Sequence, residues 1–220
     1  MNVISKSTRE IYSSIRTEMI GLHYRRLLVR QLFASDDTNE LLNKAALRFF
    51  TTLKWDLLDT IVIAISRLTD PAISFKRFNN ASLQQLIDSL DASAYSELIH
   101  SLNNIHTQIK AKSVRVENWR KKWTAHRDLE VVQSVSPKPA MSLVEVDKVL
   151  ELIGKFLNEF EHVCQDRGVE PAEEFTRRAS ESERLRIYPP IPYENRHFLP
   201  DDGNTIIELV KKAISCSGQG

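Results

Sequence analysis

The chain has 220 residues, of which 42% are hydrophobic and 27% are charged, and its formal net charge is +1 at pH 7. This composition is typical of a globular protein with one domain, or with one domain and an appendage. The near-neutral charge excludes a polycation, so any nucleic-acid binding must come from local basic patches.

Two cysteines, Cys164 and Cys216, lie far apart and form no CxxC pair. This usage excludes a disulfide framework and a thiolate metal site, and it indicates a reduced, cytoplasmic location. The most apolar stretch, residues 57–68, contains Asp59 and Arg67 and is too short to span a membrane. The N-terminus carries no apolar signal region, so we expect a cytoplasmic protein without a membrane helix.

Helices are predicted along most of the chain, because its six glycines leave long runs with a period near 3.6 residues. The first helix is expected at about residues 8–33 and the second at about 38–68. Apolar residues surround the last turns of the second helix, which is typical of a central helix in a bundle. Pro71 ends it. Its aromatic side chains are predicted to lie in the core: Phe49, Phe50 and Trp55.

Four further helices are predicted, at about residues 83–90, 92–112, 143–166 and 204–215. Ser82 caps the first of them, and a capping box of Ser142 and Glu145 opens the third. A break or turn is expected between Lys112 and a basic stretch that begins at Val116.

The chain changes character after Gly168, where a charged segment leads into the proline-rich run Tyr188–Tyr193. Prolines exclude a regular helix there and predict an extended arm. We therefore expect a helical bundle over residues 1–168. Residues 169–220 are expected to form an arm and a short C-terminal helix, packed on that bundle.

The basic stretch between Lys110 and Asp128 departs from the amphipathic pattern, since it holds seven lysines and arginines, His126 and two carboxylates. Two of the three tryptophans of the chain, Trp119 and Trp123, also lie here, four residues apart. On a helix they would share one face and anchor the stretch to the core.

An arginine and a histidine held close together can cleave RNA without a metal. The 2′-hydroxyl attacks the adjacent phosphorus, and His126 can take that proton or donate one to the leaving oxygen. The planar guanidinium of Arg120 can hold the phosphate and stabilise its growing charge. Nearby cations would bind the RNA backbone, namely Lys110, Lys112, Lys121, Lys122 and Arg127.

The spacing of Arg120 and His126 is a weak signal by itself, because Arg16 and His23 on the first helix also satisfy it. The alternative is a solvated basic helix face with His126 bonded to a backbone carbonyl.

The sequence from Arg120 to Asp128, RKKWTAHRD, resembles the Arg-Asn-Lys-x-x-Ala-His-x-Asp signature of the HEPN superfamily. It is most similar to the abortive-infection U-like branch, which we refer to as AbiU-like. The segment Arg67-Leu-Thr-Asp70-Pro71 is similar to the end of the second helix in that branch. The order of the predicted elements agrees from about residue 8 to 165.

This resemblance implies an all-α, HEPN-type bundle of long antiparallel helices, commonly a dimer in which two Arg/His pairs face one cleft. Many members are metal-independent endoribonucleases of phage-defence or toxin–antitoxin systems. The resemblance therefore implies RNA as substrate, no cofactor and no metal, and it allows a neutralising antitoxin protein as a partner.

The chain departs from the family pattern at Lys121, where active members often carry asparagine or another small polar residue. This lysine can contact phosphate, or it can mark a non-catalytic member that binds RNA or a protein as a regulator or scaffold.

Arg67 and Asp70 close the second predicted helix, where they can form a local ion pair. The family likeness implies instead that they line the cleft and orient His126. Asp128 can also accept a hydrogen bond from the imidazole, although its two-residue spacing disfavours this contact on one continuous helix.

Other sites find little support in the sequence. The remaining histidines show no metal spacing with carboxylates, and neither a P-loop nor a GxSxG motif occurs. A DNA-binding regulator is a weaker alternative, since the chain lacks a convincing helix-turn-helix spacing.

Overall fold

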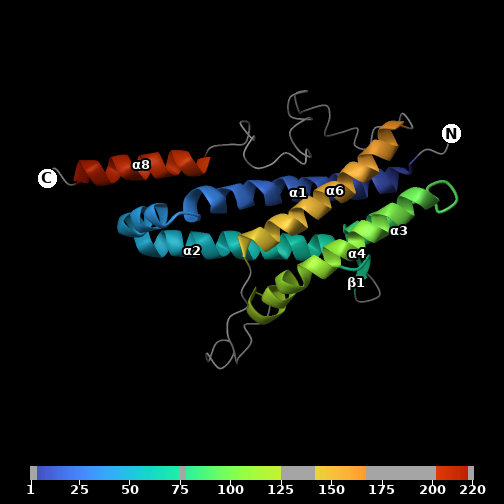
Figure 1. Ribbon diagram of the computed structural model, residues 1–220, viewed down its shortest axis with the longest axis horizontal. Helices are drawn as coiled ribbons and strands as arrows, with labels where there is room; N and C mark the ends of the chain where they lie inside the picture. The colour runs from blue at the N-terminus through green and yellow to red at the C-terminus, as the bar shows by residue number, and fades with distance from the viewer. Residues whose placement is uncertain (1–3, 75–77, 125–141, 167–201, 218–220) are drawn as a thin grey trace. The chain divides into compact units, whose positions relative to one another are not determined.

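The computed structural model describes residues 4–74, 78–124, 142–166 and 202–217 (Figure 1). Helices make up nearly all of this part, so the predicted all-α fold is confirmed. Two long helices come first, α1 (Lys6–Phe33) and α2 (Asp36–Thr69). The later helices are α3 (Leu83–Asp88), α4 (Ser96–Trp119), a π-helix (Arg120–Thr124), α6 (Leu143–Asp166) and α8 (Asp202–Ser217).

A small β-hairpin, which the sequence did not predict, lies between α2 and α3. Its strands β1 (Ile73–Ser74) and β2 (Phe78–Asn79) are antiparallel, with Ile73 opposite Asn79.

A tight turn joins α1 to α2. The Ser35 Oγ accepts a hydrogen bond from the Thr38 N–H at 3.1 Å, and the Asn39 side-chain amide donates to the Phe33 carbonyl at 3.2 Å. These bonds satisfy backbone groups that the two helix ends leave unpaired.

The chain forms two compact units. The first contains residues 1–20 and 62–196, and the second contains residues 21–61 and 197–220. Residues of α1 and α2 belong to both units, whereas α3, α4 and α6 belong to the first unit and α8 to the second. The predicted boundary at residue 168 and the proline-rich arm lie outside the described residues, so both stay predictions.

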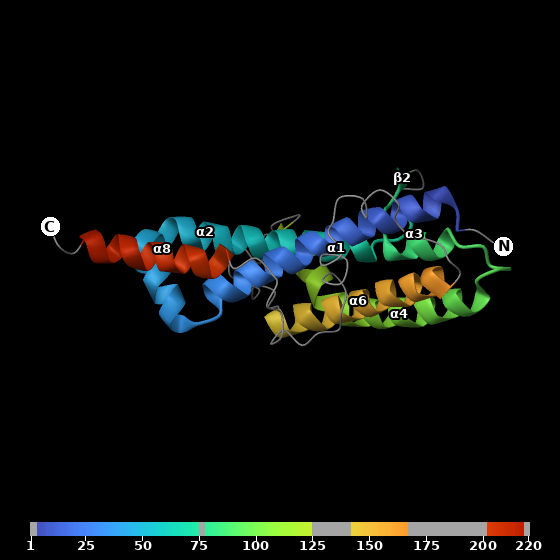
Figure 2. The same cartoon turned by 90° about the horizontal axis from the view of Figure 1, so that it is seen from above.

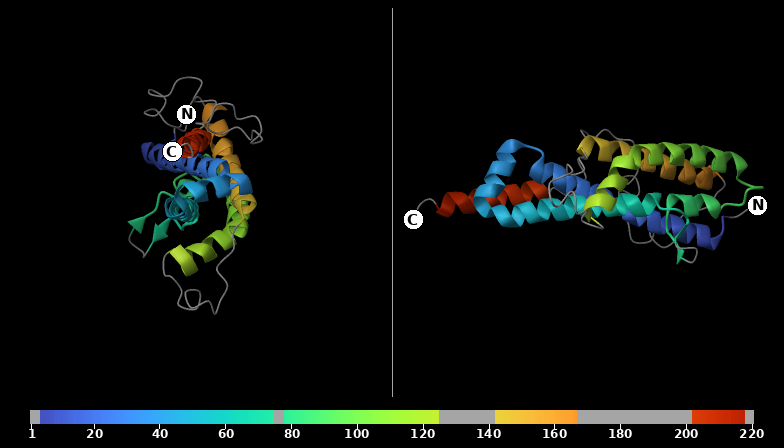
Figure 3. Two further views of the ribbon diagram at one scale, coloured as in Figure 1. Left: turned by 90° about the vertical axis from the view of Figure 1, so that its left-hand side faces the viewer. Right: turned by 90° about the horizontal axis from the view of Figure 1, so that it is seen from below.

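In the first unit, α4 and α6 pack side by side (Figure 2 and Figure 3). The ring of Tyr12 in α1 stacks on Phe160 in α6, with 5.0 Å between the ring centroids. Burial of a large apolar side chain stabilises a fold by about 1.5–3 kcal/mol. The inner face of α6 consists of buried apolar residues: Val146, Val149, Leu150, Ile153, Phe156 and Phe160.

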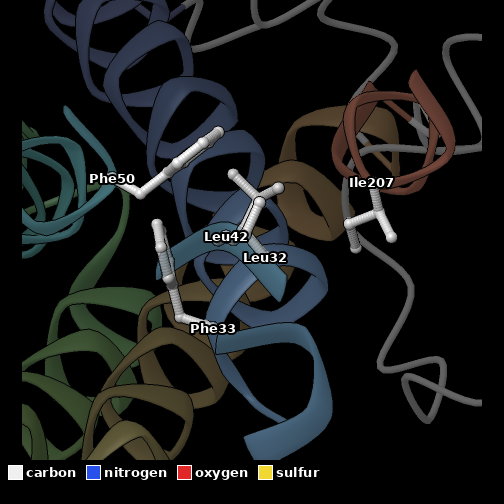
Figure 4. Packing of buried hydrophobic residues seen from close by; sticks show 5 residues of the cluster. All are labelled: Leu32, Phe33, Leu42, Phe50 and Ile207. Atoms are coloured by element: carbon white, nitrogen blue, oxygen red, sulfur yellow. The ribbon is translucent and has the colours of Figure 1, made fainter. Parts of the chain in front are cut away.

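The core of the second unit lies between α1, α2 and α8 (Figure 4). Five buried residues form it: Leu32, Phe33, Leu42, Phe50 and Ile207. The N–H of Gly203 at the start of α8 donates to the Gln31 side-chain oxygen at 3.0 Å. Helix α8 therefore packs on the α1–α2 hairpin through this hydrogen bond and an apolar face.

Two of the predicted core aromatics are wrong, because Phe49 is 60% exposed and Trp55 is 36% exposed. Adjacent residues point about 100° apart on a helix, so Phe49 and Phe50 cannot both face the core. Phe50 is buried, and Phe49 packs edge-on against it from the solvent side, with centroids 5.1 Å apart.

The predicted break after Lys112 is also wrong, because α4 continues to Trp119. Its buried face runs on through Ile109, Ser113 and Val116. A buried serine, Ser113, occupies an apolar register position on this face.

None of the helices in the described part of the chain is long and apolar enough to cross a membrane.

Candidate functional site

Arg120 lies directly after α4, at the first position of the π-helix. Its own N–H bonds to the carbonyls of Val116 and Glu117, so the backbone leaves the α4 ladder without a loop. Trp119, the last residue of α4, is buried and anchors this turn, as predicted. Short π-helical turns occur frequently at functional sites. The side chain of Trp123 lies outside the described residues.

The guanidinium of Arg120 forms an ion pair with Asp70, and the Nη1–Oδ1 distance is 2.9 Å. The two residues are 50 positions apart in the chain. Their side chains are 41% and 27% exposed, so the pair lies at the surface and water screens it. A pair of this kind stabilises a fold by at most about 1 kcal/mol.

The backbone on either side of Asp70 is fixed by hydrogen bonds. The Thr69 hydroxyl donates to the Ile65 carbonyl at 3.0 Å, which closes the last turn of α2. The Asn80 side chain donates to the Pro71 carbonyl at 2.7 Å, and the Asn80 N–H donates to the Ala72 carbonyl at 2.8 Å. The carboxylate of Asp70 is thus presented from a rigid corner.

Arg67 pairs with Glu18 of α1 at 3.3 Å, whereas Asp70 pairs with Arg120. The local ion pair that the sequence suggested between Arg67 and Asp70 is therefore replaced by two pairs to other elements. Arg67 and Arg120 both lie near the C-terminal end of α2, where the helix dipole favours cations.

The four lysines that we predicted to bind RNA are exposed: Lys110, Lys112, Lys121 and Lys122. Lys121 lies within 3.6 Å of Glu117 one turn earlier. On an ideal helix, Lys110 and Lys112 would project roughly 80° to either side of Arg120. The cations of α4 thus flank the Arg120 position along the helix.

His126, Arg127 and Asp128 lie outside the described residues, which end at Thr124 and resume at Ser142. The pairing of Arg120 with His126 therefore stays a prediction, as does the role of Asp128. Ser142 and Glu145 form the predicted capping box, in which Glu145 N–H donates to Ser142 Oγ at 3.2 Å and Ser142 N–H donates back at 2.9 Å.

An ion pair that the sequence did not predict joins α4 to the start of α6. Arg115 Nη1 lies 2.7 Å from Glu145 Oε1. The Ser142 backbone N–H lowers the pKa of Glu145, and Arg115 lowers it further. The two helices that flank residues 125–141, α4 and α6, are thus joined by an ion pair.

Two buried titratable groups lie elsewhere in the first unit. Burial and the charge of Lys110 lower the pKa of His106 on α4, so this imidazole is neutral at pH 7. Burial raises the pKa of Glu161 on α6 to about 7, although its carboxylate accepts a hydrogen bond from Tyr12 and lies 4.0 Å from Arg16 Nε. Among the described residues, no cluster of His, Cys, Asp and Glu could hold a metal ion.

The family model HEPN_AbiU2, described as AbiU2, matches residues 5–181 of the chain. Comparisons with curated proteins and with solved structures found no match.

Proposed function

Because the chain belongs to the AbiU2 family of HEPN proteins, we propose that it is a metal-independent endoribonuclease of a phage-defence or toxin–antitoxin system. The observation that carries this proposal is the half-exposed guanidinium of Arg120, held on a π-helical turn by Asp70. Family membership suggests a ribonuclease or abortive-infection role in outline.

In the proposed reaction, Arg120 binds the scissile phosphate. A guanidinium carries five N–H donors, and the contact to Asp70 engages Nη1 alone among the described contacts of this side chain. The remaining donors can face two phosphate oxygens in a forked geometry. Asp70 then sets the orientation of the fork.

His126 serves as the general acid or base in this scheme. The RNA 2′-hydroxyl attacks the adjacent phosphorus and loses its proton, while the bond to the 5′-oxygen breaks and that oxygen gains a proton. The products would be a 2′,3′-cyclic phosphate and a 5′-hydroxyl. Two copies of the chain would supply two Arg/His pairs to one cleft, as the family likeness implies.

The exposed lysines at 110, 112, 121 and 122, together with Arg127, would bind the RNA backbone. Each phosphate contact releases counterions, so RNA binding should weaken steeply as salt rises. Contacts to the backbone phosphates would give affinity for RNA without a preference for a particular sequence.

The test is cleavage of total RNA by the purified protein in the presence of EDTA. Arg120→Ala and His126→Ala should each lower the rate by about 10²-fold or more, the range expected for a phosphate-binding donor or a general acid/base. Arg25→Ala and His100→Ala, which replace an arginine and a histidine of other surfaces, serve as matched controls. A rate that is unchanged in His126→Ala excludes the mechanism.

A second candidate is a non-catalytic regulator or scaffold that binds RNA or a protein. The ion pair of Arg120 with Asp70 and the contact of Lys121 with Glu117 favour it, because both cations already have carboxylate neighbours. Expression in a bacterial host separates the two candidates. A ribonuclease should arrest growth, His126→Ala should relieve the arrest, and a neutralising antitoxin should do the same; a scaffold should not slow growth.

A further inference from the structure

The C-terminal end of α2 reaches solvent along one narrow side. Among the described residues 61–70, Arg67 alone is exposed, Ile63 and Asp70 are half-buried, and the others are buried. Ile63, Arg67 and Asp70 follow one another at steps of four and three residues, so they share one side of the helix end. An otherwise buried helix end therefore presents one cation and one carboxylate to solvent.

Two ion pairs join this side of α2 to neighbouring helices. Arg67 Nη1 lies 3.3 Å from Glu18 Oε1 of α1, and Asp70 Oδ1 lies 2.9 Å from the Nη1 of Arg120, directly after α4. The Cβ atoms of residues three apart on a helix are about 5–6 Å from each other. The guanidinium groups of Arg67 and Arg120 thus belong to one patch of the first unit, on which charge alternates from Glu18 to Arg120.

Arg67 is the more accessible of the two arginines. Its side chain is 65% exposed, against 41% for that of Arg120. The Glu18 side chain is 31% exposed, so water screens the pair, and a pair of this kind contributes little to stability. Exchange of the Glu18 carboxylate for another anion therefore costs the fold little.

An RNA strand carries a phosphate at every nucleotide, so a strand with one phosphate at Arg120 has others close by. A guanidinium can hold a phosphate, as it holds a carboxylate, through two parallel N–H···O bonds. The exposed lysines of the proposed site lie on α4 and the π-helix, whereas Arg67 supplies a cation from another element.

We propose that Arg67 is a second phosphate-binding residue of this site. It takes a phosphate that neighbours the scissile one in the same RNA strand, and Glu18 holds its guanidinium until RNA arrives. The inference rests on RNA binding at Arg120, as in the proposed function, and it does not require cleavage. Arg67 contributes affinity and has no part in breaking the bond.

The two partners of the pair should act in opposite directions on RNA affinity. Arg67→Ala removes a cation that binds phosphate, so it should weaken binding of single-stranded RNA by about tenfold or more. Glu18→Gln removes a carboxylate that competes with phosphate, so it should strengthen binding by about two- to fivefold. The double variant should bind as weakly as Arg67→Ala alone, because the effect of Glu18 depends on Arg67.

The measurement is filter binding of a short single-stranded RNA in a His126→Ala background, which keeps the RNA intact. Lys44 and Glu40 provide matched controls, because they form an exposed ion pair at 2.6 Å in the second unit. Lys44→Ala and Glu40→Gln repeat the two charge changes there, and each should alter the affinity by less than about twofold, since salt screens distant exposed charges.

Salt dependence gives a second readout. Loss of one phosphate contact to a single strand should reduce the slope of log K against log salt concentration by about 0.7 in Arg67→Ala. Lys44→Ala should leave the slope unchanged. An ion pair with a purely structural role would not produce this change in slope.

Opposite shifts in Arg67→Ala and Glu18→Gln support the proposal. It is overturned if Glu18→Gln binds RNA no more tightly than Glu40→Gln, if Arg67→Ala binds no more weakly than Lys44→Ala, or if the protein binds no RNA. Should Arg67→Ala prove unfolded by circular dichroism, Arg67→Gln takes its place.

The outcome for Arg67 is separate from that for the ribonuclease. A protein that shows the opposite shifts but never cleaves RNA contradicts the proposed enzyme and leaves the role of Arg67 standing. Cleavage without the opposite shifts contradicts the role of Arg67 alone.

Discussion

At the scale of single residues, Asp70 is the structural support of the proposed site. It contacts Arg120 at 2.9 Å from a corner fixed by Thr69 and Asn80. In the proposed ribonuclease, Asp70 is a positioning residue and makes no contact with the substrate.

We expect Asp70→Asn to lower the turnover of RNA by roughly tenfold while changing RNA affinity little, because a displaced guanidinium still attracts phosphate. Single-turnover cleavage and filter binding would separate the two effects. Glu18→Gln removes the neighbouring ion pair to Arg67 and should leave turnover unchanged. A fall in affinity alone would assign Asp70 to binding.

Glu161 makes the stability of the first unit depend on pH. Burial raises its pKa in the folded state to about 7, above the ordinary value of 4.5. The unfolded chain therefore loses this proton first, and the free energy of unfolding should fall as pH rises from about 4.5 to 7 and then level off. At about 1.4 kcal/mol for each pH unit between the two pKa values, the whole fall is on the order of 3 kcal/mol.

Urea denaturation at several pH values checks this expectation. Glu161→Gln should remove the fall between pH 4.5 and 7, since its amide does not titrate. Glu159→Gln, two residues away and bonded to Ser101, is the control and should keep it. The same slope in both variants would assign the pH dependence to other groups.

At the scale of elements, close packing decides where α8 sits on the α1–α2 hairpin. A Cβ added at Gly203 would lie 2.4 Å from the Gln31 Cβ, which no real contact allows, whereas a Cβ at Gly154 in α6 would meet nothing within 4 Å. Substitution by alanine should therefore change the stability differently at the two glycines.

Gly203→Ala should destabilise the second unit by about 1–3 kcal/mol, because α8 must shift away from α1. Gly154→Ala should stabilise the protein by about 0.5–1 kcal/mol, since alanine favours a helix over glycine. Denaturation midpoints measure both effects. A stabilising Gly203→Ala would mean that α8 does not pack as described.

The local signals in the sequence located most elements well. Pro71 ends α2 within two residues, and the Ser142–Glu145 box begins α6, because both act through the backbone nearby. Phe49 and Trp55 were misplaced, since periodicity alone does not say which of several apolar faces meets a partner. The break expected before the basic stretch was wrong, since the buried face of α4 runs on through Ser113 and Val116 to Trp119.

The site itself was predictable only in part. Arg120 and the exposed lysines follow from composition and family likeness, whereas the pairing of Arg120 with Asp70 joins residues 50 positions apart. Such a contact depends on how the end of α4 meets the end of α2. The same holds for Arg67, whose partner proved to be Glu18 of α1.

At the scale of the whole molecule, the family match and the two units divide the chain differently. The match ends at residue 181, while α8 begins at Asp202 and packs with residues 21–61. The second unit thus combines a hairpin within the matched span with a helix beyond it.

The ion pair between Arg120 and Asp70 has a consequence for ligand choice. A lone inorganic phosphate or a mononucleotide would meet a guanidinium whose charge Asp70 already partly neutralises, and it would gain little from the donors that remain. A polymer is different, because neighbouring phosphates held by the lysines raise the local concentration of the one that reaches Arg120. Asp70 would in this way act as a filter that keeps the abundant small anions of the cell from occupying the guanidinium.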